Sequence, residues 1–364
     1  MLKTHKPDYI LLVITAILVF YGLVMIASAG IVLSNEIFHQ SYYYLKNQLT
    51  KGILVGVILG SLAFFIPYRL WRKFSVFLLV ITVILLIAVF IPKIGSGSRG
   101  VSRWINLAFF SFQPAEILKL TFLIYLAAWL DSRSKNIGNL KHGFIPFLII
   151  VSAIGVLVLK QPDIGTFAVV AASAIAVFFL AGARLSHIFL IFIIGVLGLF
   201  ILINLYSYAS NRWQVFVHPE LEPQGIGYQI NQTILSLGSG GMFGVGLGQS
   251  RQKYNYLPEP VSDSIVAVIG EELGFIGLFV LISLFLAFAY RGFKISRNAP
   301  DKFATILSGG ITSLILIQVF INISAICGLI PLTGITLPFI SYGGSSLAVS
   351  LTGVGILLNI SKYT

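Results

Sequence analysis

Ten long apolar runs, separated by short polar segments, dominate the pattern of hydrophobic and polar positions along the chain. Most of the runs are close to the roughly 20 residues that a helix needs to cross a bilayer. None alternates between apolar and polar positions as the strands of a membrane barrel do. Because lipid admits only helices and closed barrels as spanning structures, the pattern predicts an all-α membrane protein, a polytopic bundle of about ten transmembrane helices forming one integral membrane domain over residues 1–364. The expected spans are residues 9–31, 49–66, 74–92, 115–130, 144–160, 164–182, 188–206, 264–290, 303–327 and 344–361.

Composition supports this prediction. The 364 residues are 57% hydrophobic and only 10% charged, whereas a soluble domain has about 25% charged residues. Cys327 is the only cysteine, which excludes an internal disulfide and a thiolate metal cluster. The net charge of +12 is spread over short loops rather than gathered on one face. We therefore expect no nucleic-acid partner, and attribute the basic residues to membrane topology and an anionic substrate.

The basic residues also predict the orientation of the chain. The two termini and the short linkers 67–73, 131–143, 183–187 and 291–302 contain 14 of the 24 Lys and Arg residues. The positive-inside rule then places both termini in the cytoplasm. The same topology puts nine of the twelve acidic residues on the outer side. A long extracytoplasmic loop, about 207–263 between spans 7 and 8, is the largest feature of this outer face and the first place to expect function.

Two polar clusters lie outside that loop. The first combines Arg103 with Glu116 and Lys119, which are three residues apart and share a helix face. Either the two form a simple ion pair, or Arg103 and Lys119 face an anionic ligand while Glu116 orients the lysine. The second contains Gln161 and Asp163 between two apolar runs. Asp163 is either a helix cap or one of the intramembrane charges that mark functional sites.

The central loop contains a glycine-rich stretch and ends at an acid. Residues 237–248 lack a GK[ST] ending and so carry no nucleotide signal, but their glycines would let backbone N–H groups approach a ligand closely. Asp263 immediately precedes a span, where it is either a helix cap or a functional carboxylate. Small residues continue on the same helix face down to Gly277. Glu271 and Glu272, deeper in that span, have to be protonated, paired or close to water.

The last outer segment, residues 328–346, is uncharged and rich in proline, glycine and hydroxyl side chains. This composition is typical of a re-entrant or broken-helix segment buried in protein. Selectivity filters have a similar composition, so this stretch alone leaves a channel open as an alternative.

The motifs together resemble one family. Their order along the chain is that of the SEDS family, which includes RodA, FtsW and SpoVE, and the likeness covers essentially the whole chain with a slight lean towards FtsW. The motifs are Gln113-Pro114-x-Glu116-x-x-Lys119, Gln161-Pro162-Asp163-x-Gly165-Thr166, Gly227-Tyr228-Gln229, Gly238-Ser239-Gly240-Gly241, Leu257-Pro258-Glu259, Glu271-Glu272-Leu273-Gly274 and Leu337-Pro338-Phe339-x-Ser341-Tyr342-Gly343-Gly344-Ser345.

The resemblance implies a glycosyltransferase of the bacterial cytoplasmic membrane that polymerises lipid II, with a class B penicillin-binding protein as its partner. It assigns the catalytic role to Asp263. This chain departs from the family pattern H-T-D-F, because Val261-Ser262-Asp263-Ser264 lacks both the histidine and the phenylalanine. A proton relay through that histidine is therefore not expected, whereas the carboxylate is retained. The residues expected to bind substrate are the motif positions and the basic residues of the outer face, namely Arg103, Glu116, Lys119, Gln161, Asp163, Tyr228, Gln229, Arg251, Lys253, Glu259 and Ser341.

A single carboxylate suits this reaction. The acceptor hydroxyl has to lose a proton, which a carboxylate can accept. The leaving group, undecaprenyl pyrophosphate, is a stable anion that needs positive charge rather than a second acid. Arg103, Lys119, Arg251 and Lys253 are the candidate cations, with or without a divalent cation such as Mg²⁺ or Mn²⁺. Two alternatives remain at this stage: a flippase for the lipid-linked precursor, and a non-catalytic scaffold that activates a penicillin-binding protein.

Overall fold

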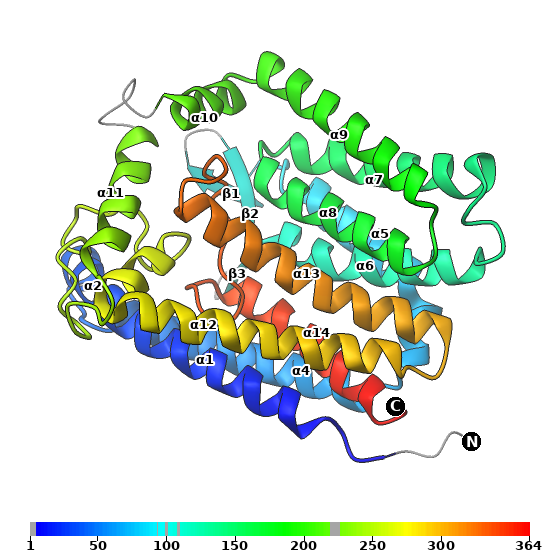
Figure 1. The fold of residues 1–364 in the computed structure, drawn as a ribbon, viewed down its shortest axis with the longest axis horizontal. Helices are drawn as coiled ribbons and strands as arrows, with labels where there is room; N and C mark the ends of the chain where they lie inside the picture. Colours follow the sequence, from blue (N-terminus) through cyan, green and yellow to red (C-terminus); the bar gives the residue numbers. More distant parts are fainter. Residues whose placement is uncertain (1–4, 93, 99–100, 108–109, 219–225) are drawn as a thin grey trace.

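The computed structural model describes residues 5–92, 94–98, 101–107, 110–218 and 226–364. These residues form an elongated bundle whose helices run mainly along its long axis (Figure 1). A helix lies at each of the ten expected spans. These helices are α1 (Tyr9–Ala29), η1 (Gln48–Leu54) continued by α4 (Val55–Phe65), α5 (Tyr68–Ala88), α6 (Pro114–Ser132), η2 (Leu140–Phe144) continued by α7 (Ile145–Leu159), α8 (Ile164–Leu180), α9 (Leu185–Leu205), α12 (Ile265–Arg297), α13 (Lys302–Ile326) and α14 (Gly344–Ser361).

Among the described residues, eight helices are long and apolar enough to cross a membrane by length and composition alone. The two expected spans outside that group are α8, which has only 17 residues, and α6, which contains three charged residues. Both pack against α13 in the interior. A helix that is surrounded by other helices needs less apolar surface than one that faces lipid, so the weaker signal of α6 fits its position.

The centre of the bundle is formed by α13 and α14, most of whose side chains are buried, whereas nearly all of α9 is exposed, as expected for a helix facing lipid. The closest helix pairs are α4 with α14, α12 with α13, α8 with α13, α5 with α6, and α1 with α12. The described N-terminal segment, which begins at His5, lies beside the C-terminus at one end of the bundle, and α2 and α11 lie at the other (Figure 1). Asp8 accepts a 2.9 Å hydrogen bond from Nε of Arg291 at the end with the termini.

The expected outer loops contain more regular structure than predicted. Residues 32–48 include most of α2 (Ile31–Phe38) and α3 (Tyr43–Asn47), and the long loop contains α10 (Ser207–Val217) and α11 (Ile226–Ser239). Of these, α3 continues through η1 into α4 as one apolar helix, Tyr43–Phe65, so the second span begins earlier than predicted. The other three helices are too short or too polar to give a spanning signal. The expected linker 291–302 was also drawn too long, because α12 continues to Arg297.

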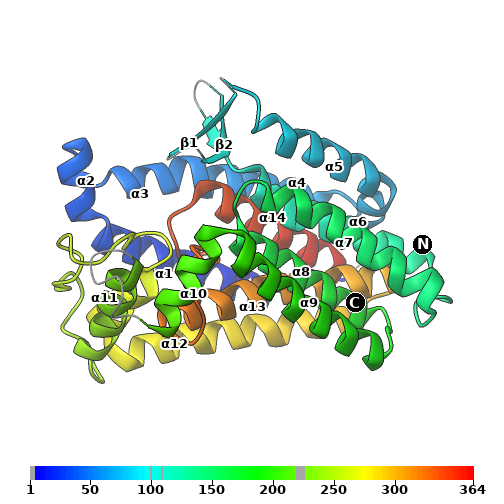
Figure 2. The same ribbon diagram turned by 90° about the horizontal axis from the view of Figure 1, so that it is seen from above.

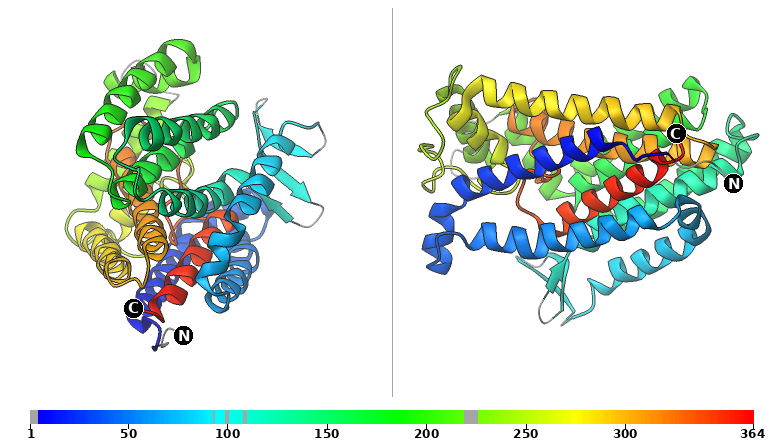
Figure 3. Two further views of the ribbon diagram at one scale, coloured as in Figure 1. Left: turned by 90° about the vertical axis from the view of Figure 1, so that its right-hand side faces the viewer. Right: turned by 90° about the horizontal axis from the view of Figure 1, so that it is seen from below.

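A small sheet, found among the described residues, departs from the predicted all-α fold. β1 (Gly95–Ser98), β2 (Val101–Leu107) and β3 (Phe110–Phe112) pair antiparallel in that order. The sheet projects from the side of the bundle beside α5 (Figures 2 and 3). The strands have only three to seven residues, so their alternation of polarity is too brief to stand out between two spans.

The glycine-rich loop packs its backbone tightly against α12, with positive φ at Gly241, Gly244, Gly246 and Gly248. At Gly274 the backbone of α12 leaves helical geometry, with φ 64° and ψ −161°. The N–H groups of Val245 and Gly246 donate to the carbonyls of Glu271 and Glu272 at 2.9 and 3.0 Å. The loop therefore satisfies backbone groups that the kink releases. The kink also interrupts the continuous small-residue face expected along this helix.

Candidate active site

A polar cavity of about 580 Å³ lies where the loops before α12 and α14 meet the start of α6 and the junction of α7 and α8. Five of the predicted site residues line it: Arg103, Glu116, Asp163, Glu259 and Asp263. The other described lining residues are Tyr43, Asn47, Lys51, Trp104, Ser111, Gln113, Thr166, Ser262, Gly334, Ile335, Thr336, Tyr342, Gly343, Gly344, Ser345 and Ser346. The sequence thus predicted the acidic part of this cavity and missed one of its walls.

The position of Asp263 is fixed by a hydrogen bond to its backbone carbonyl, and its side chain does not cap α12. The N-cap of α12 is Ser264, and no side chain caps this helix, so the alternative of Asp263 as a helix cap is wrong. Nδ2 of the buried Asn322 donates to the carbonyl of Asp263 at 2.9 Å and to that of Ile335 at 2.7 Å. This one side chain therefore joins the loop before α12 to the segment before α14, and leaves the Asp263 carboxylate facing the cavity.

The pKa of Asp263 is raised from its ordinary value of 3.8 to about 6. Burial of the carboxylate is the main cause, and the negative charge of Glu259 adds to it. The Arg212 guanidinium and a hydrogen bond from Ser262 act in the opposite direction. A carboxylate with a pKa near neutrality that still ionises at pH 7 has the properties of a general base.

Ser341 holds two loops together from outside the cavity. Its hydroxyl donates to the carbonyl of Ser262 and accepts from the backbone N–H of Leu337 at 2.8 Å. Tyr342 adds a backbone hydrogen bond of 2.8 Å to the carbonyl of Val261. The segment before α14 is thus irregular backbone packed into protein, as its composition predicted. Ser341 is not among the described residues that line the cavity, so its contribution is to fix the loop that carries Asp263.

Asp163 combines the two roles that the sequence left open. Its carboxylate caps α8 by accepting from the N–H of Thr166 at 3.1 Å and from its hydroxyl at 2.9 Å, and it also lines the cavity. Nε of Arg103 donates to the carbonyl of Gln161 at 3.0 Å, and a second guanidinium nitrogen donates to that of Pro162. Arg103 therefore fixes the turn on which Asp163 stands. Gln161 is buried behind that turn and bonds the carbonyl of Leu86.

Glu116 and Lys119 form an ion pair, and Glu116 also lines the cavity. Oε2 of Glu116 lies 2.7 Å from Nζ of Lys119, and Nζ donates to Oε1 of Gln318 at 2.8 Å. Glu116 reaches the cavity in the first turn of α6, whereas Lys119 is 4% exposed and lies one turn behind it. The ion pair is confirmed, and Lys119 reaches the cavity through the carboxylate of Glu116 rather than directly.

Four other predicted substrate-binding residues do not reach the cavity among the residues described. Tyr228 and Gln229 lie on α11, where Nε2 of Gln229 donates to the hydroxyl of Ser264 at 3.1 Å. Arg251 has an exposed side chain near the glycine-rich loop. Lys253 is buried, with Nζ 2.8 Å from Oε1 of Glu272. The positive charge of Arg251 is thus exposed to solvent, and that of Lys253 is paired inside the protein.

The prediction that Glu271 and Glu272 are paired or otherwise satisfied is confirmed. Glu272 pairs with Lys253 and accepts from the Ser28 hydroxyl at 2.7 Å. Glu271 accepts from the backbone N–H of Arg251 at 2.8 Å and from the hydroxyl of Ser236 at 3.1 Å. Both carboxylates therefore anchor the glycine-rich loop to α12.

The wall missed by sequence reasoning comes from α3 and η1, which contribute Tyr43, Asn47 and Lys51. The signal was present in the sequence. Lys51 is a lysine inside an apolar span, which is a candidate functional residue by default. The three residues lie four positions apart, the spacing at which side chains share one face of a helix.

Negative charge exceeds positive charge in the cavity. The described lining contains four carboxylates but only Lys51 and Arg103 as cationic side chains. Within the described part of the chain, no group of three His, Cys, Asp or Glu residues is arranged to hold a metal ion. A cation there would have one or two carboxylate ligands at most from the protein, which is how Mg²⁺ is commonly bound when substrate phosphates supply the remaining oxygens.

The comparisons with known proteins agree with this geometry. The model of the FtsW/RodA/SpoVE family, described as cell cycle protein, matches residues 9–364. The chain belongs to this family. It is 43% identical to stage V sporulation protein E of Bacillus subtilis, with 100% of this chain and 99% of that protein covered. It is 42% identical to the probable peptidoglycan glycosyltransferase FtsW of Trichlorobacter lovleyi, covering 99% of this chain and 94% of that one.

Solved structures show the same fold. A chain from a study of structural coordination of polymerization and crosslinking by a peptidoglycan synthase complex superposes with a TM-score of 0.80 at 26% identity, covering 98% of this chain and 97% of that one. The rod shape determining protein RodA of Thermus thermophilus superposes with a TM-score of 0.72 at 26% identity, covering 98% of each chain. This member of the FtsW/RodA/SpoVE family is therefore a multi-pass helical membrane protein of the cytoplasmic membrane.

Proposed function

We propose that this chain is a peptidoglycan glycosyltransferase that polymerises lipid II into β-1,4 glycan strands at the outer face of the cytoplasmic membrane, with Asp263 as the general base. The observation that carries the proposal is the Asp263 carboxylate, whose pKa of about 6 is matched to proton abstraction near neutral pH. It faces a cavity lined by Glu116, Asp163 and Arg103. Family membership supplies the substrate class, because relatives that are 42% and 39% identical are named probable peptidoglycan glycosyltransferases.

The proposed step is a single displacement. The acceptor sugar's 4-hydroxyl oxygen forms a bond to the anomeric carbon of the donor as the bond from that carbon to the pyrophosphate oxygen breaks. The hydroxyl proton passes to the Asp263 carboxylate, and the electron pair of the broken bond leaves with undecaprenyl pyrophosphate. Attack from the side opposite the leaving group converts the α-linked donor into a β-linked strand. No second carboxylic acid is needed, because the pyrophosphate leaves as a stable anion.

Positive charge for the leaving group has three proposed sources. Lys51 and Arg103 line the cavity directly. Lys119 acts through Glu116, whose carboxylate it partly neutralises at 2.7 Å. A divalent cation, Mg²⁺ or Mn²⁺, is the third, since four lining carboxylates would otherwise repel a pyrophosphate. Such an ion would neutralise the pyrophosphate when bound. If it is required, chelation by EDTA abolishes polymerisation and added Mg²⁺ restores it.

The arrangement of the acids favours a transferase over the flippase alternative. A flippase needs polar groups along a path through the membrane. Here Glu116, Asp163, Glu259 and Asp263 share one cavity, and the buried Glu271 and Glu272 are bound to the protein itself. A scaffold without activity would have no use for a carboxylate whose pKa is raised to about 6, because such a group reduces stability at neutral pH.

Two further features belong to this proposal. The basic end of the bundle, with both termini, faces the cytoplasm, as expected from the positive-inside rule. A class B penicillin-binding protein is the proposed partner that cross-links the new strands, in keeping with the similarity to a chain of a peptidoglycan synthase complex. The orientation of the chain is tested by fusing reporter proteins after residue 364. A reporter that works only in the cytoplasm should be active, and one that works only outside it should be inactive.

The deciding experiment combines two assays on the purified protein. Fluorescent lipid II in detergent, with and without the partner, should give glycan ladders on a gel. Fluorescent lipid II in proteoliposomes should show no protein-dependent translocation when its headgroup is quenched from outside. Translocation without ladders would establish the flippase, and neither signal despite partner binding would establish the scaffold.

A further inference from the structure

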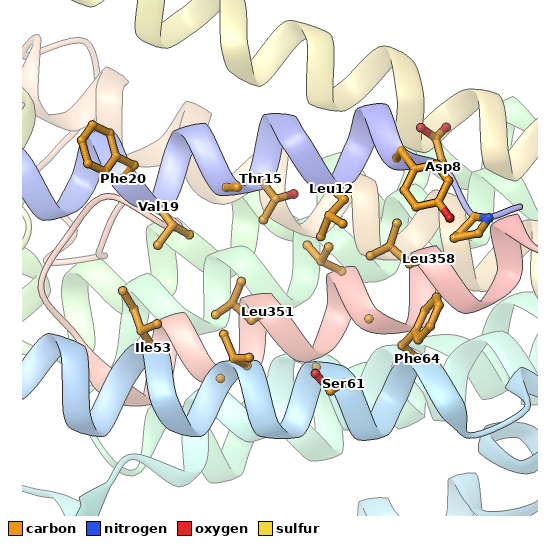
Figure 4. Close-up of a pocket in the computed structure, with 18 of the residues that line it drawn as sticks. Asp8, Leu12, Thr15, Val19, Phe20, Ile53, Ser61, Phe64, Leu351 and Leu358 are labelled. Carbon is orange, nitrogen blue, oxygen red and sulfur yellow. The ribbon is translucent and has the colours of Figure 1, made fainter.

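A second cavity, of about 700 Å³, lies between α1, α4 and α14 and within the membrane-spanning part of the bundle. Side chains from all three helices line it, including Leu12, Val19, Phe64, Leu351 and Leu358 (Figure 4). Leu12 is 46% exposed, so the cavity is a groove open to its surroundings rather than an enclosed core defect. It is separate from the polar cavity and is not used by the proposed reaction.

Close backbone packing forms the floor of this groove. A Cβ atom on Gly355 would lie 2.1 Å from the carbonyl oxygen of Gly60, and one on Gly60 would lie 2.8 Å from that of Leu351. These glycines let α4 and α14 approach each other closely. Meanwhile α1 packs mainly against α12. The slot left between α1 and the α4–α14 pair is therefore built into the helix packing.

The groove is long enough to hold one lipid chain. It runs along α1 from Tyr9 to Leu23, which is about 21 Å at 1.5 Å per residue. That length exceeds the depth of a single leaflet, which is half of the roughly 30 Å hydrocarbon core, so one acyl chain fits within the groove. A polyprenyl chain is much longer than this, and a helix is about 10 Å wide, too wide for a slot of this volume.

The end of the groove nearest the chain termini is basic. Nζ of Lys362 lies 3.4 Å from the ring centroid of Phe64, which lines the groove. Lys6 directly precedes Pro7, another lining residue. Asp8, the acid that lines the groove at this end, is paired with Arg291. Lys6 is exposed, and Lys362 donates a 3.2 Å hydrogen bond to the carbonyl of Phe64 while remaining partly exposed, so both lysines keep their positive charge at this end, where it attracts an anionic headgroup.

We propose that the groove between α1, α4 and α14 binds one acyl chain of an anionic phospholipid, whose headgroup lies at Lys6 and Lys362. The chain fills the space that α1 leaves beside α4, and the headgroup bridges the N-terminal segment and the end of α14. This inference is independent of the glycosyltransferase activity, because its readout is lipid binding rather than polymerisation.

Native mass spectrometry of the purified protein tests the proposal, with dioleoylphosphatidylglycerol and dioleoylphosphatidylcholine as probes. Wild type should bind one phosphatidylglycerol at least tenfold more tightly than phosphatidylcholine. The groove-filling pair Ala16→Phe and Ser61→Phe should reduce phosphatidylglycerol binding at least tenfold. The matched pair Ile17→Phe and Leu62→Phe adds the same rings at neighbouring exposed positions outside the groove and should bind as wild type does.

The headgroup contact has its own variant. Lys6→Gln with Lys362→Gln should remove the preference for phosphatidylglycerol, whereas Lys141→Gln with Lys302→Gln, exposed lysines elsewhere, should preserve it. Equal binding of both lipids by wild type would overturn the proposal. Undiminished phosphatidylglycerol binding by the groove-filling pair would do the same. So would displacement of phosphatidylglycerol by an equal concentration of undecaprenyl phosphate. If the groove-filling pair does not fold, a photoactivatable phosphatidylglycerol applied to wild type tests the proposal instead. It should label α1, α4 and α14, and labelling confined to α9 would refute the site.

Discussion

Lys253 and Glu272 form a buried ion pair, with 2.8 Å between Nζ and Oε1 and side chains that are 2% and 0% exposed. Nζ of Lys253 also donates to the carbonyl of Gly248 at 2.7 Å. The pair therefore links the glycine-rich loop to α12 at the depth where that helix is kinked. This lysine, which its position in a polar outer loop predicted to face the substrate, is instead paired inside the protein.

Removing the lysine should destabilise the protein strongly. Lys253→Met leaves Glu272 buried without its partner, which typically costs about 3–5 kcal/mol. Arg251→Gln, two residues away and exposed, should change stability by less than about 0.5 kcal/mol. Thermal unfolding in detergent compares the two, and the double variant Lys253→Met with Glu272→Gln should recover part of the loss. Equal melting temperatures for wild type and Lys253→Met would show that the pair contributes nothing.

The kink in α12 gives a second prediction. Gly274 has φ 64° and ψ −161°, a region of backbone space that is essentially restricted to glycine. A Cβ there would also lie 2.3 Å from the backbone nitrogen of Gly244. Gly274→Ala should therefore destabilise the protein by more than about 2 kcal/mol. The control is Gly198→Ala on α9, where a Cβ meets nothing within 4 Å, and there the better helix propensity should stabilise by about 0.5–1 kcal/mol.

Activity should depend on the ionisation of Asp263. Because its pKa is raised to about 6 and the base has to be ionised, the rate should be constant above about pH 7 and fall tenfold per pH unit well below 6. Glu259→Gln removes a negative charge that raises this pKa, so the acidic limb of the profile should move to lower pH. Initial rates between pH 4.5 and 8.5 measure both. A limb that does not move would mean that another group controls the profile.

The same pKa predicts that rising pH lowers the stability of the protein while it raises the activity. A folded-state pKa above the ordinary value of 3.8 means that the folded protein binds more protons than the unfolded chain between about pH 4 and 6. Stability therefore falls as pH rises through that window. Asp263→Asn should melt at a higher temperature than wild type at pH 7.5 and at the same temperature at pH 4. A lower melting temperature at pH 7.5 would contradict this assignment.

The spans were predictable because the requirement for apolar residues in lipid acts on every position of a helix. Thus even α6, with its internal charges, was found from its apolar run. The strands around Trp104 and the short helices α2 and α10 were not found, because elements of three to eleven residues leave no period long enough to read.

The site residues were predictable only where a sequence motif stands at a chain position that opens on the cavity. Asp263, Glu259 and Asp163 each stand at a helix or loop end that opens on the cavity, and the sequence identified them. Lys253 was assigned to substrate by its position in a polar loop, since nothing local indicates that a residue 19 positions later on another element takes its charge. The loop that carries this lysine packs against α12 around the kink at Gly274, which the helical spacing of small residues concealed.

The central claim is that the Asp263 carboxylate removes the acceptor proton. The most direct test is the initial rate of lipid II polymerisation at pH 8 by wild type, Asp263→Asn and Glu259→Gln, each shown to be folded by its melting curve and to bind the penicillin-binding partner. Asp263→Asn should be slower by about 100-fold to 10,000-fold, the range for loss of a general base, whereas Glu259→Gln should stay within about threefold of wild type because its charge only modulates the pKa of Asp263. A folded Asp263→Asn protein that polymerises lipid II at the wild-type rate would contradict the account.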